Sequence, residues 1–135
     1  MISALLPGEF ATAVIAELDP VSGEVAVANA GHPPVLHVTP AGAEHLRDGR
    51  GPALGLVPDA GYRELRFPLG PADQLLLYSD GLVERRGADL GQGLAALRAA
   101  AGSGAPEPKR LLDDVVDALA PSDADDVTVV AIGRT

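Results

Sequence analysis

The stretch "DQLLLYSDGLVERR" (residues 73–86) decides the fold that we expect, because an apolar run ends there in an aspartate and a glycine. Residues 73–79 are apolar on both faces, which is typical of a central strand that is covered above and below. Asp80 and Gly81 follow at once. The sequence therefore predicts a buried strand that presents a carboxylate at its C-terminal end.

Several further segments have the pattern of strands. Residues 10–20 and 23–31 are separated by a short turn at Asp19-Pro20 and predict a β-hairpin, with Val25 and Val27 on one face. Residues 33–40 and 62–69 predict two more strands, and the polar stretch 41–51 predicts a turn with a weak strand. Residues 125–135 predict a last strand in a buried sheet.

Two helices precede that last strand. Residues 89–102 place Leu90, Leu94 and Leu97 on one stripe, and Gly102 is suited to end the helix. Residues 106–120 open with prolines, which a first helical turn tolerates, and continue with apolar residues at helical spacing. Antiparallel strands with helices inserted late predict an α+β layered fold over residues 1–135.

Composition excludes several functional classes. The 135 residues carry a net charge of −9, which argues against a nucleic-acid partner, because such binders show a basic face. The chain has no cysteine, which excludes thiolate metal sites and cysteine nucleophiles and suits a reducing cytoplasm. No apolar run approaches the roughly 20 residues of a membrane helix, so we expect no membrane span.

Two aspartates are candidates for a metal site. Asp80 ends one predicted strand and Asp125 precedes the last one, so antiparallel pairing of these strands would bring both carboxylates to one edge. Two like charges about 4 Å apart repel by roughly 4 kcal/mol at a protein surface, which favours uptake of a cation. Oxygen ligands without cysteine select Mg²⁺ or Mn²⁺. Asp126 and Glu84 belong to the same edge, and Gly81 would leave room for an ion or substrate.

An ordinary structural role explains the same residues. Asp-Gly after a strand is a common turn, and Asp126 suits a solvated strand entry. His32, in "NAGHPP", fits a histidine that caps the turn before Pro33-Pro34, with a place at the substrate edge as the alternative. Arg85 and Arg86 fit either a phosphoprotein contact or a solvated helix start.

Five motifs resemble a known family. In order they are "FATAVIAELDP", "VANAGHPPVLHV", "GPALGL", "LLLYSDGLVERR" and "DDVTVVAIGR". Together they resemble the bacterial, SpoIIE-like branch of the metal-dependent PPM (type 2C) protein phosphatases over essentially the whole chain. The resemblance implies a β-sandwich flanked by helices and hydrolysis of phosphoserine or phosphothreonine by a water that two Mn²⁺ or Mg²⁺ ions activate.

The same resemblance assigns roles and partners. It implies that Asp80 and Asp125 are metal ligands. Gly81, His32 and Asp126 are further candidates for the substrate edge or for a place behind the ligands. It also implies a phosphoprotein substrate, an anti-sigma factor antagonist in this branch. A non-catalytic pseudophosphatase that acts as an interaction module remains the alternative.

One motif of the family is absent. Its members begin with an Asp-x-x-Gly-His-Gly type motif that supplies a further metal aspartate, and nothing before Phe10 matches it. We therefore expect residues 1–135 to be the C-terminal portion of such a domain, with weak or no catalysis alone. We also expect the uncovered apolar sheet surface to favour self-association.

Overall fold

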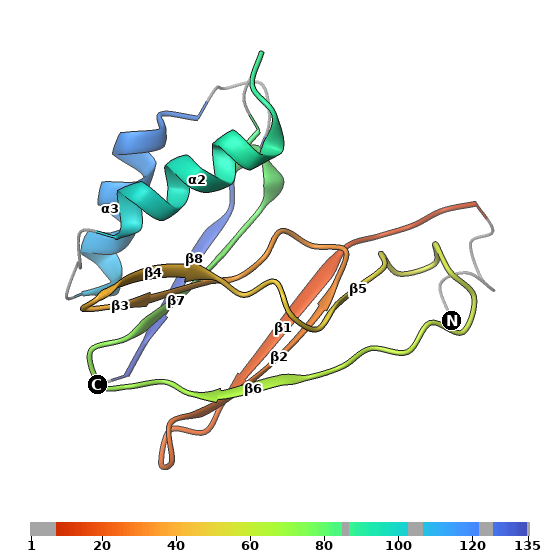
Figure 1. Ribbon diagram of the computed structural model, residues 1–135, viewed down its shortest axis with the longest axis horizontal. Helices are drawn as coiled ribbons and strands as arrows, with labels where there is room; N and C mark the ends of the chain where they lie inside the picture. The colour runs from red at the N-terminus through yellow and green to blue at the C-terminus, as the bar shows by residue number, and fades with distance from the viewer. Residues whose placement is uncertain (1–7, 85–86, 103–106, 122–125, 135) are drawn as a thin grey trace. The chain divides into compact units, whose positions relative to one another are not determined.

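The computed structural model describes residues 8–84, 87–102, 107–121 and 126–134 of the chain. Their contacts divide into two compact units. The first unit comprises Met1–Pro34 and Arg47–Leu69, and the second comprises Val35–Leu46 and Gly70–Thr135. Each unit contains one four-stranded sheet (Figure 1).

The sheet of the first unit is built around β2 (Glu24–Ala30). On one side, β2 pairs antiparallel with β1 (Ala13–Leu18), which confirms the predicted hairpin. On the other side, β2 pairs antiparallel with β6 (Leu65–Pro68) and, at its C-terminal end, parallel with the short β5 (Arg50–Gly51). Val25 and Val27 are buried on one face of β2, as their alternation predicts.

A carboxylate holds the hairpin turn between β1 and β2. Asp19 Oδ1 accepts hydrogen bonds from the backbone N–H groups of Val21 (2.8 Å) and Ser22 (3.2 Å). These hydrogen bonds to the charged form lower the pKa of the exposed Asp19 carboxyl below its ordinary value. This aspartate turn explains why the strand pattern stops at Asp19-Pro20.

The sheet of the second unit has the order β4-β3-β7-β8 and is antiparallel throughout. Its strands are β3 (Leu36–Thr39), β4 (Gly42–His45), β7 (Gln74–Tyr78) and β8 (Val129–Gly133). β7 lies between β3 and β8, and Leu75 and Leu76 are fully buried. The apolar run of residues 73–79 is thus an interior strand, as predicted.

Two helices belong to this second unit, α2 (Leu90–Ala101) and α3 (Pro108–Leu119), and they lie side by side over the sheet (Figure 1). α2 begins at Asp89, whose side chain accepts a hydrogen bond from the Gln92 N–H (2.8 Å), and ends at Gly102. In α3, Pro108 occupies the first turn, where its missing N–H costs nothing.

The helices and the sheet share one apolar core. It includes strand residues, the segment after β7 and one stripe of each helix. Its buried members are Leu36, Val38, Ala43, Leu76, Tyr78, Leu82, Val83, Leu94, Leu97, Ala101, Leu111, Val115 and Leu119. The helical periodicity of the sequence thus identifies the inward faces of α2 and α3 correctly.

Some details of the predictions are wrong. Leu90 is 52% exposed, because it opens α2 ahead of the residues that reach the core. β8 is an edge strand and not a fully buried one, and its Val130 is 47% exposed. The polar stretch 41–51 holds two strands, β4 and β5, and His45 lies on β4. Short polar strands are missed because their residues carry no periodic apolar signal.

The predicted α+β class with mostly antiparallel strands is confirmed. Among the residues with a described placement, no helix has the length and apolar character needed to cross a bilayer.

Candidate functional site

Asp80 lies where β7 ends, as predicted. Tyr78 is the last residue of β7, and Asp80 opens a single 3₁₀ turn, η1 (Asp80–Leu82). The Asp80 carbonyl accepts the N–H groups of Val83 (3.0 Å) and Glu84 (2.9 Å). The backbone of Asp80 is therefore fixed on both sides, while its side chain is exposed.

Ser79 extends the pairing of β7 with the segment that leads into β8. Its N–H donates to the Thr128 carbonyl (2.9 Å), and its hydroxyl oxygen accepts the Thr128 N–H (2.8 Å). The hydroxyl also donates to the Asp126 carbonyl at 3.4 Å. Ser79 thus ties the backbone beside Asp80 to the start of the last strand, and sequence reasoning gave Ser79 no such role.

Two buried apolar side chains hold the turn against the core of the second unit. Leu82 and Val83 are 1% and 0% exposed and belong to the core of the second unit. Gly93 of α2 faces this segment so closely that a Cβ there would collide with the backbone carbonyl of Val83. α2 can pack against the turn only because residue 93 is a glycine, a role that the sequence analysis missed.

The carboxylate of Asp80 makes no hydrogen bond or ion pair to another residue of the described ranges, and the exposed carboxylate of Asp126 is in the same situation. Tyr78 pairs with Val129, so the same register continued by two residues places Asp80 opposite Val127, next to Asp126. Asp125, the other predicted ligand, lies outside the described residues. The predicted antiparallel pairing of β7 and β8 is confirmed, while the meeting of the two side chains stays a prediction.

The donor chemistry of this edge suits a hard cation only in part. Asp80 and Asp126 offer oxygen ligands, which Mg²⁺ and Mn²⁺ prefer. Within the described ranges, however, no three histidine, aspartate or glutamate side chains are grouped closely enough to hold a metal ion. Further ligands are therefore needed for a closed site. Gly81 is buried within the turn and has no side chain to offer as a ligand, and its predicted place at the substrate edge stays a prediction.

His32 lies in the first unit, on the loop after β2. Its N–H donates to Asn29 Oδ1 (2.8 Å) just before Pro33-Pro34, so Asn29 supplies this cap, and the predicted capping role of the histidine stays a prediction. Its ring Nδ1 is 3.2 Å from Thr12 Oγ1, and its carbonyl accepts two hydrogen bonds from Arg50. A role at the substrate edge stays a prediction.

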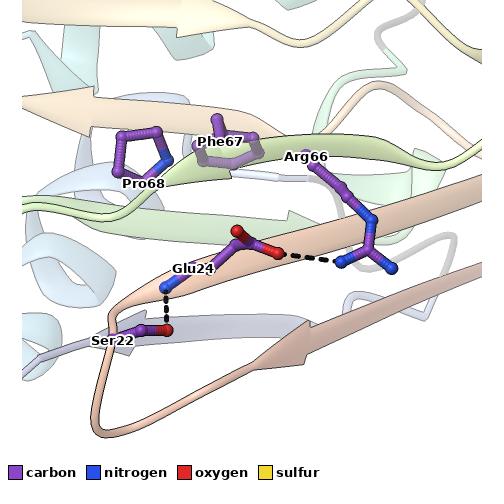
Figure 2. A pocket seen from close by; sticks show the side chains of 5 residues that line it. All are labelled: Ser22, Glu24, Arg66, Phe67 and Pro68. Carbon is purple, nitrogen blue, oxygen red and sulfur yellow. Dashed lines mark hydrogen bonds and ion pairs between the residues drawn. The ribbon is translucent and has the colours of Figure 1, made fainter.

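A separate hollow of about 300 Å³ lies in the first unit between β6 and the turn before β2. Ser22, Glu24, Arg66, Phe67 and Pro68 line it (Figure 2). Arg66 donates to Glu24 Oε1 and to Glu64 Oε2, each at 2.8 Å, and these carboxylates raise the pKa of its guanidinium. Because two carboxylates already neutralise the Arg66 guanidinium, this arginine gives the hollow no unpaired positive charge that would bind an anion.

Comparison with known proteins identifies the family of the chain. A family model described as Stage II sporulation protein E (SpoIIE) matches residues 1–135. The chain belongs to the SpoIIE family.

Solved structures share this fold. The RsbU and RsbW domains of Rv1364c from Mycobacterium tuberculosis are 35% identical, with a TM-score of 0.81 over 98% of this chain and 39% of that chain. The PPM Ser-Thr phosphatase MsPP from Mycobacterium smegmatis, solved with cacodylate, is 26% identical, with a TM-score of 0.63 over 99% of this chain and 68% of that chain. RsbX, at 14% identity a likeness of fold alone, was solved in complex with magnesium.

One curated relative matches a shorter part of the chain. Protein IcfG from Synechocystis is 31% identical over 77 residues, which are 57% of this chain and 12% of that protein. The chain thus spans only a small part of this relative and about two fifths of the first structural neighbour.

In this SpoIIE-family chain, sequence reasoning proposed Asp80 as a candidate ligand but missed the residues that hold its turn. Ser79 and Gly93 act through close contacts with the backbone of Thr128 and of Val83. A serine directly before Asp-Gly and a glycine inside an apolar helix are the signals that were available. Neither signal identifies the residue that is contacted, because that residue belongs to another element of the chain.

Proposed function

We propose that residues 1–135 are the C-terminal portion of a metal-dependent protein serine/threonine phosphatase domain of the SpoIIE family. In this proposal, Asp80 and Asp125 hold a Mn²⁺ or Mg²⁺ ion of a two-ion site. The substrate is a phosphoserine or phosphothreonine of a regulatory protein. The observation that carries the proposal is the exposed Asp80 carboxylate, which has no partner among the described residues and stands on a turn fixed by hydrogen bonds and buried anchors.

The chain's own residues would orient ligands. Ser79 holds the end of β7 against the residues before β8, so that the backbone that carries Asp80 keeps one position. Leu82 and Val83 fix the turn from the apolar side. Bound divalent ions would activate a water and neutralise phosphoryl charge. A rigid ligand matters because small errors of position weaken both ion binding and catalysis.

Two observations support the class of substrate and partner. MsPP, at 26% identity over nearly the whole chain, is a PPM Ser-Thr phosphatase. Rv1364c combines RsbU and RsbW domains, which supports our proposal of an anti-sigma factor antagonist as the phosphoprotein partner. The reducing cytoplasm suggested by the lack of cysteine suits such a regulatory circuit.

One observation favours a second candidate, a non-catalytic interaction module. The described part of the chain holds no group of three metal-ligating side chains. A module of this kind would still bind the phosphoprotein but would turn it over slowly or not at all.

Hydrolysis of a phosphoserine peptide by the purified chain in the presence of Mn²⁺ tests the proposal. We expect slow release of phosphate that requires Mn²⁺ and falls at least about tenfold in Asp80→Asn, because a metal ligand is lost. Asp117→Asn, which removes an equal charge from the exposed face of α3, should retain the activity. Equal release by both variants, or release without metal, would contradict the proposed role of Asp80. Fast turnover would contradict the proposal that ligands are missing.

A further inference from the structure

The loop after β2 gathers polar groups from three separate segments of the first unit. Thr12 precedes β1, His32 follows β2, and Arg50 opens β5. Thr12 Oγ1 is 3.2 Å from His32 Nδ1, and Arg50 donates to the His32 carbonyl through Nε (3.1 Å) and Nη2 (2.8 Å). His32 therefore connects a hydroxyl on one side with a guanidinium on the other.

The loop is held rigidly. Asn29 is only 5% exposed, and its amide accepts the His32 N–H (2.8 Å) and donates to the Pro33 carbonyl (3.3 Å). Gly31 adopts a φ of 68°, and a Cβ there would lie 2.8 Å from the backbone of Ala53. The Gly31 N–H also donates to the Gly51 carbonyl (2.8 Å). A loop fixed in this way loses little entropy when it binds a ligand.

Arg50 keeps its positive charge available. Its two hydrogen bonds go to a carbonyl, and in the described ranges it has no ion pair and no hydrogen bond from Nη1. Arg66 in the same unit is different, because two carboxylates neutralise it at 2.8 Å each. In a chain with a net charge of −9, an exposed and oriented arginine without a carboxylate partner is a point that attracts an anion.

We propose that Arg50 and Thr12 form an anion site around His32 that binds a phosphate monoester dianion. When His32 Nδ1 carries the proton, it donates to Thr12 Oγ1, and the hydroxyl hydrogen is left to donate to a phosphate oxygen. The Arg50 guanidinium supplies planar N–H donors that match phosphate oxygens. The proposal for this site invokes no metal ion and no residue of the second unit.

Nuclear magnetic resonance titration of the ¹⁵N-labelled chain tests the site, with inorganic phosphate and a phosphoserine peptide as the probes. We expect saturable shifts of the Gly31, His32 and Gly51 amides. Arg50→Ala should weaken binding at least about tenfold, because hydrogen bonds to charged groups contribute about 1.5–3 kcal/mol. Arg50→Lys and Thr12→Val should each weaken it about threefold.

Arg63→Ala is the matched control, because Arg63 is exposed in the same unit and makes no hydrogen bond to another described residue. It should change the affinity less than twofold, and unchanged amide spectra without ligand will show that each variant is folded. Tighter binding of the peptide assigns the site to protein-borne phosphate, and equal affinities assign it to any phosphate monoester or free phosphate. Absence of saturable shifts, or equal losses in Arg50→Ala and Arg63→Ala, would overturn the proposal.

Discussion

The two units hold their candidate loops by different means. In the second unit, the Asp80 turn is anchored by Leu82 and Val83, which are buried in a core shared with two helices. In the first unit, the His32 loop is anchored by a buried polar side chain, Asn29. The first unit has no helix among its described residues, and its Ile15 is 69% exposed.

The difference concerns how each loop responds to mutation. Apolar anchoring spreads the stabilisation over many contacts, and a truncated core residue weakens the whole unit. Polar anchoring concentrates the stabilisation in a few hydrogen bonds, and the loss of one partner leaves a buried donor or acceptor unsatisfied. We therefore expect the second unit to dominate global stability and the first to respond locally.

Truncation in the core should have the largest effect. Leu76 is fully buried in the middle of β7, so Leu76→Ala should lower the free energy of unfolding by about 2–5 kcal/mol. Ile15→Ala on the exposed face of β1 should change it by about 0.5 kcal/mol or less. Urea unfolding measures both variants, and equal losses of unfolding free energy would contradict the proposed difference between the units.

The second-largest effect should come from a side chain added between α2 and the Asp80 turn. Gly93→Ala places a Cβ against the Val83 backbone carbonyl, which cannot rotate away, and overpacking of this kind costs about 1–3 kcal/mol. Gly91→Ala lies in the exposed first turn of the same helix, where a Cβ would meet only Asp89 Oδ1 at 3.1 Å, and should change stability by less than about 1 kcal/mol. Thermal unfolding separates the two variants, and a stabilising Gly93→Ala would show that α2 does not fix the turn.

Removal of the polar anchor should act mainly on the first unit. Asn29→Ala leaves the His32 N–H without its acceptor, at a cost of about 1–3 kcal/mol. Asn29→Asp keeps the acceptor oxygen for the His32 N–H but loses the donor to the Pro33 carbonyl, so it should retain only part of the protection. Amide hydrogen exchange of residues 31 and 32 is the measurement, and unchanged protection in Asn29→Ala would contradict the anchoring role.

A substitution in the hairpin turn should have the smallest effect on stability, and this effect should depend on pH. The pKa of Asp19 is lowered by the Val21 and Ser22 N–H groups, so its contribution to stability is present above the ordinary carboxyl pKa of 3.8. That contribution is lost as the pH falls through the lowered pKa of the folded state. Asp19→Ala should be less stable than the parent chain at pH 7, and the difference should vanish in strong acid. A constant difference in urea midpoint across this range would contradict the assignment.

Local patterns predicted much of the fold. The alternation in residues 23–31, the apolar run before Asp80 and the helical spacing after Leu90 each depend on neighbours within one element. The short strands β4 and β5 were not separated, because two to four polar residues form a strand only through their partners. The exposed Val130 was missed for a related reason, since position at a sheet edge is a property of the whole topology.

The candidate site was predicted less completely. The position of Asp80 followed from the end of an apolar strand, and the antiparallel neighbour was inferred correctly. The supports at Ser79 and Gly93 depend on close approaches between different elements of the chain, and no periodicity within one element encodes such contacts. The same holds for Arg50 and His32, whose hydrogen bonds join the short strand β5 to the loop after β2.

Calorimetric titration of the chain with Mn²⁺ tests the central claim most directly. We predict saturable binding that Asp80→Asn and Asp125→Asn each abolish, because both carboxylates serve the same ion, while Asp117→Asn binds as the parent chain does. Binding that survives both substitutions, or that Asp117→Asn weakens equally, would contradict the claim that this pair of aspartates forms the metal site.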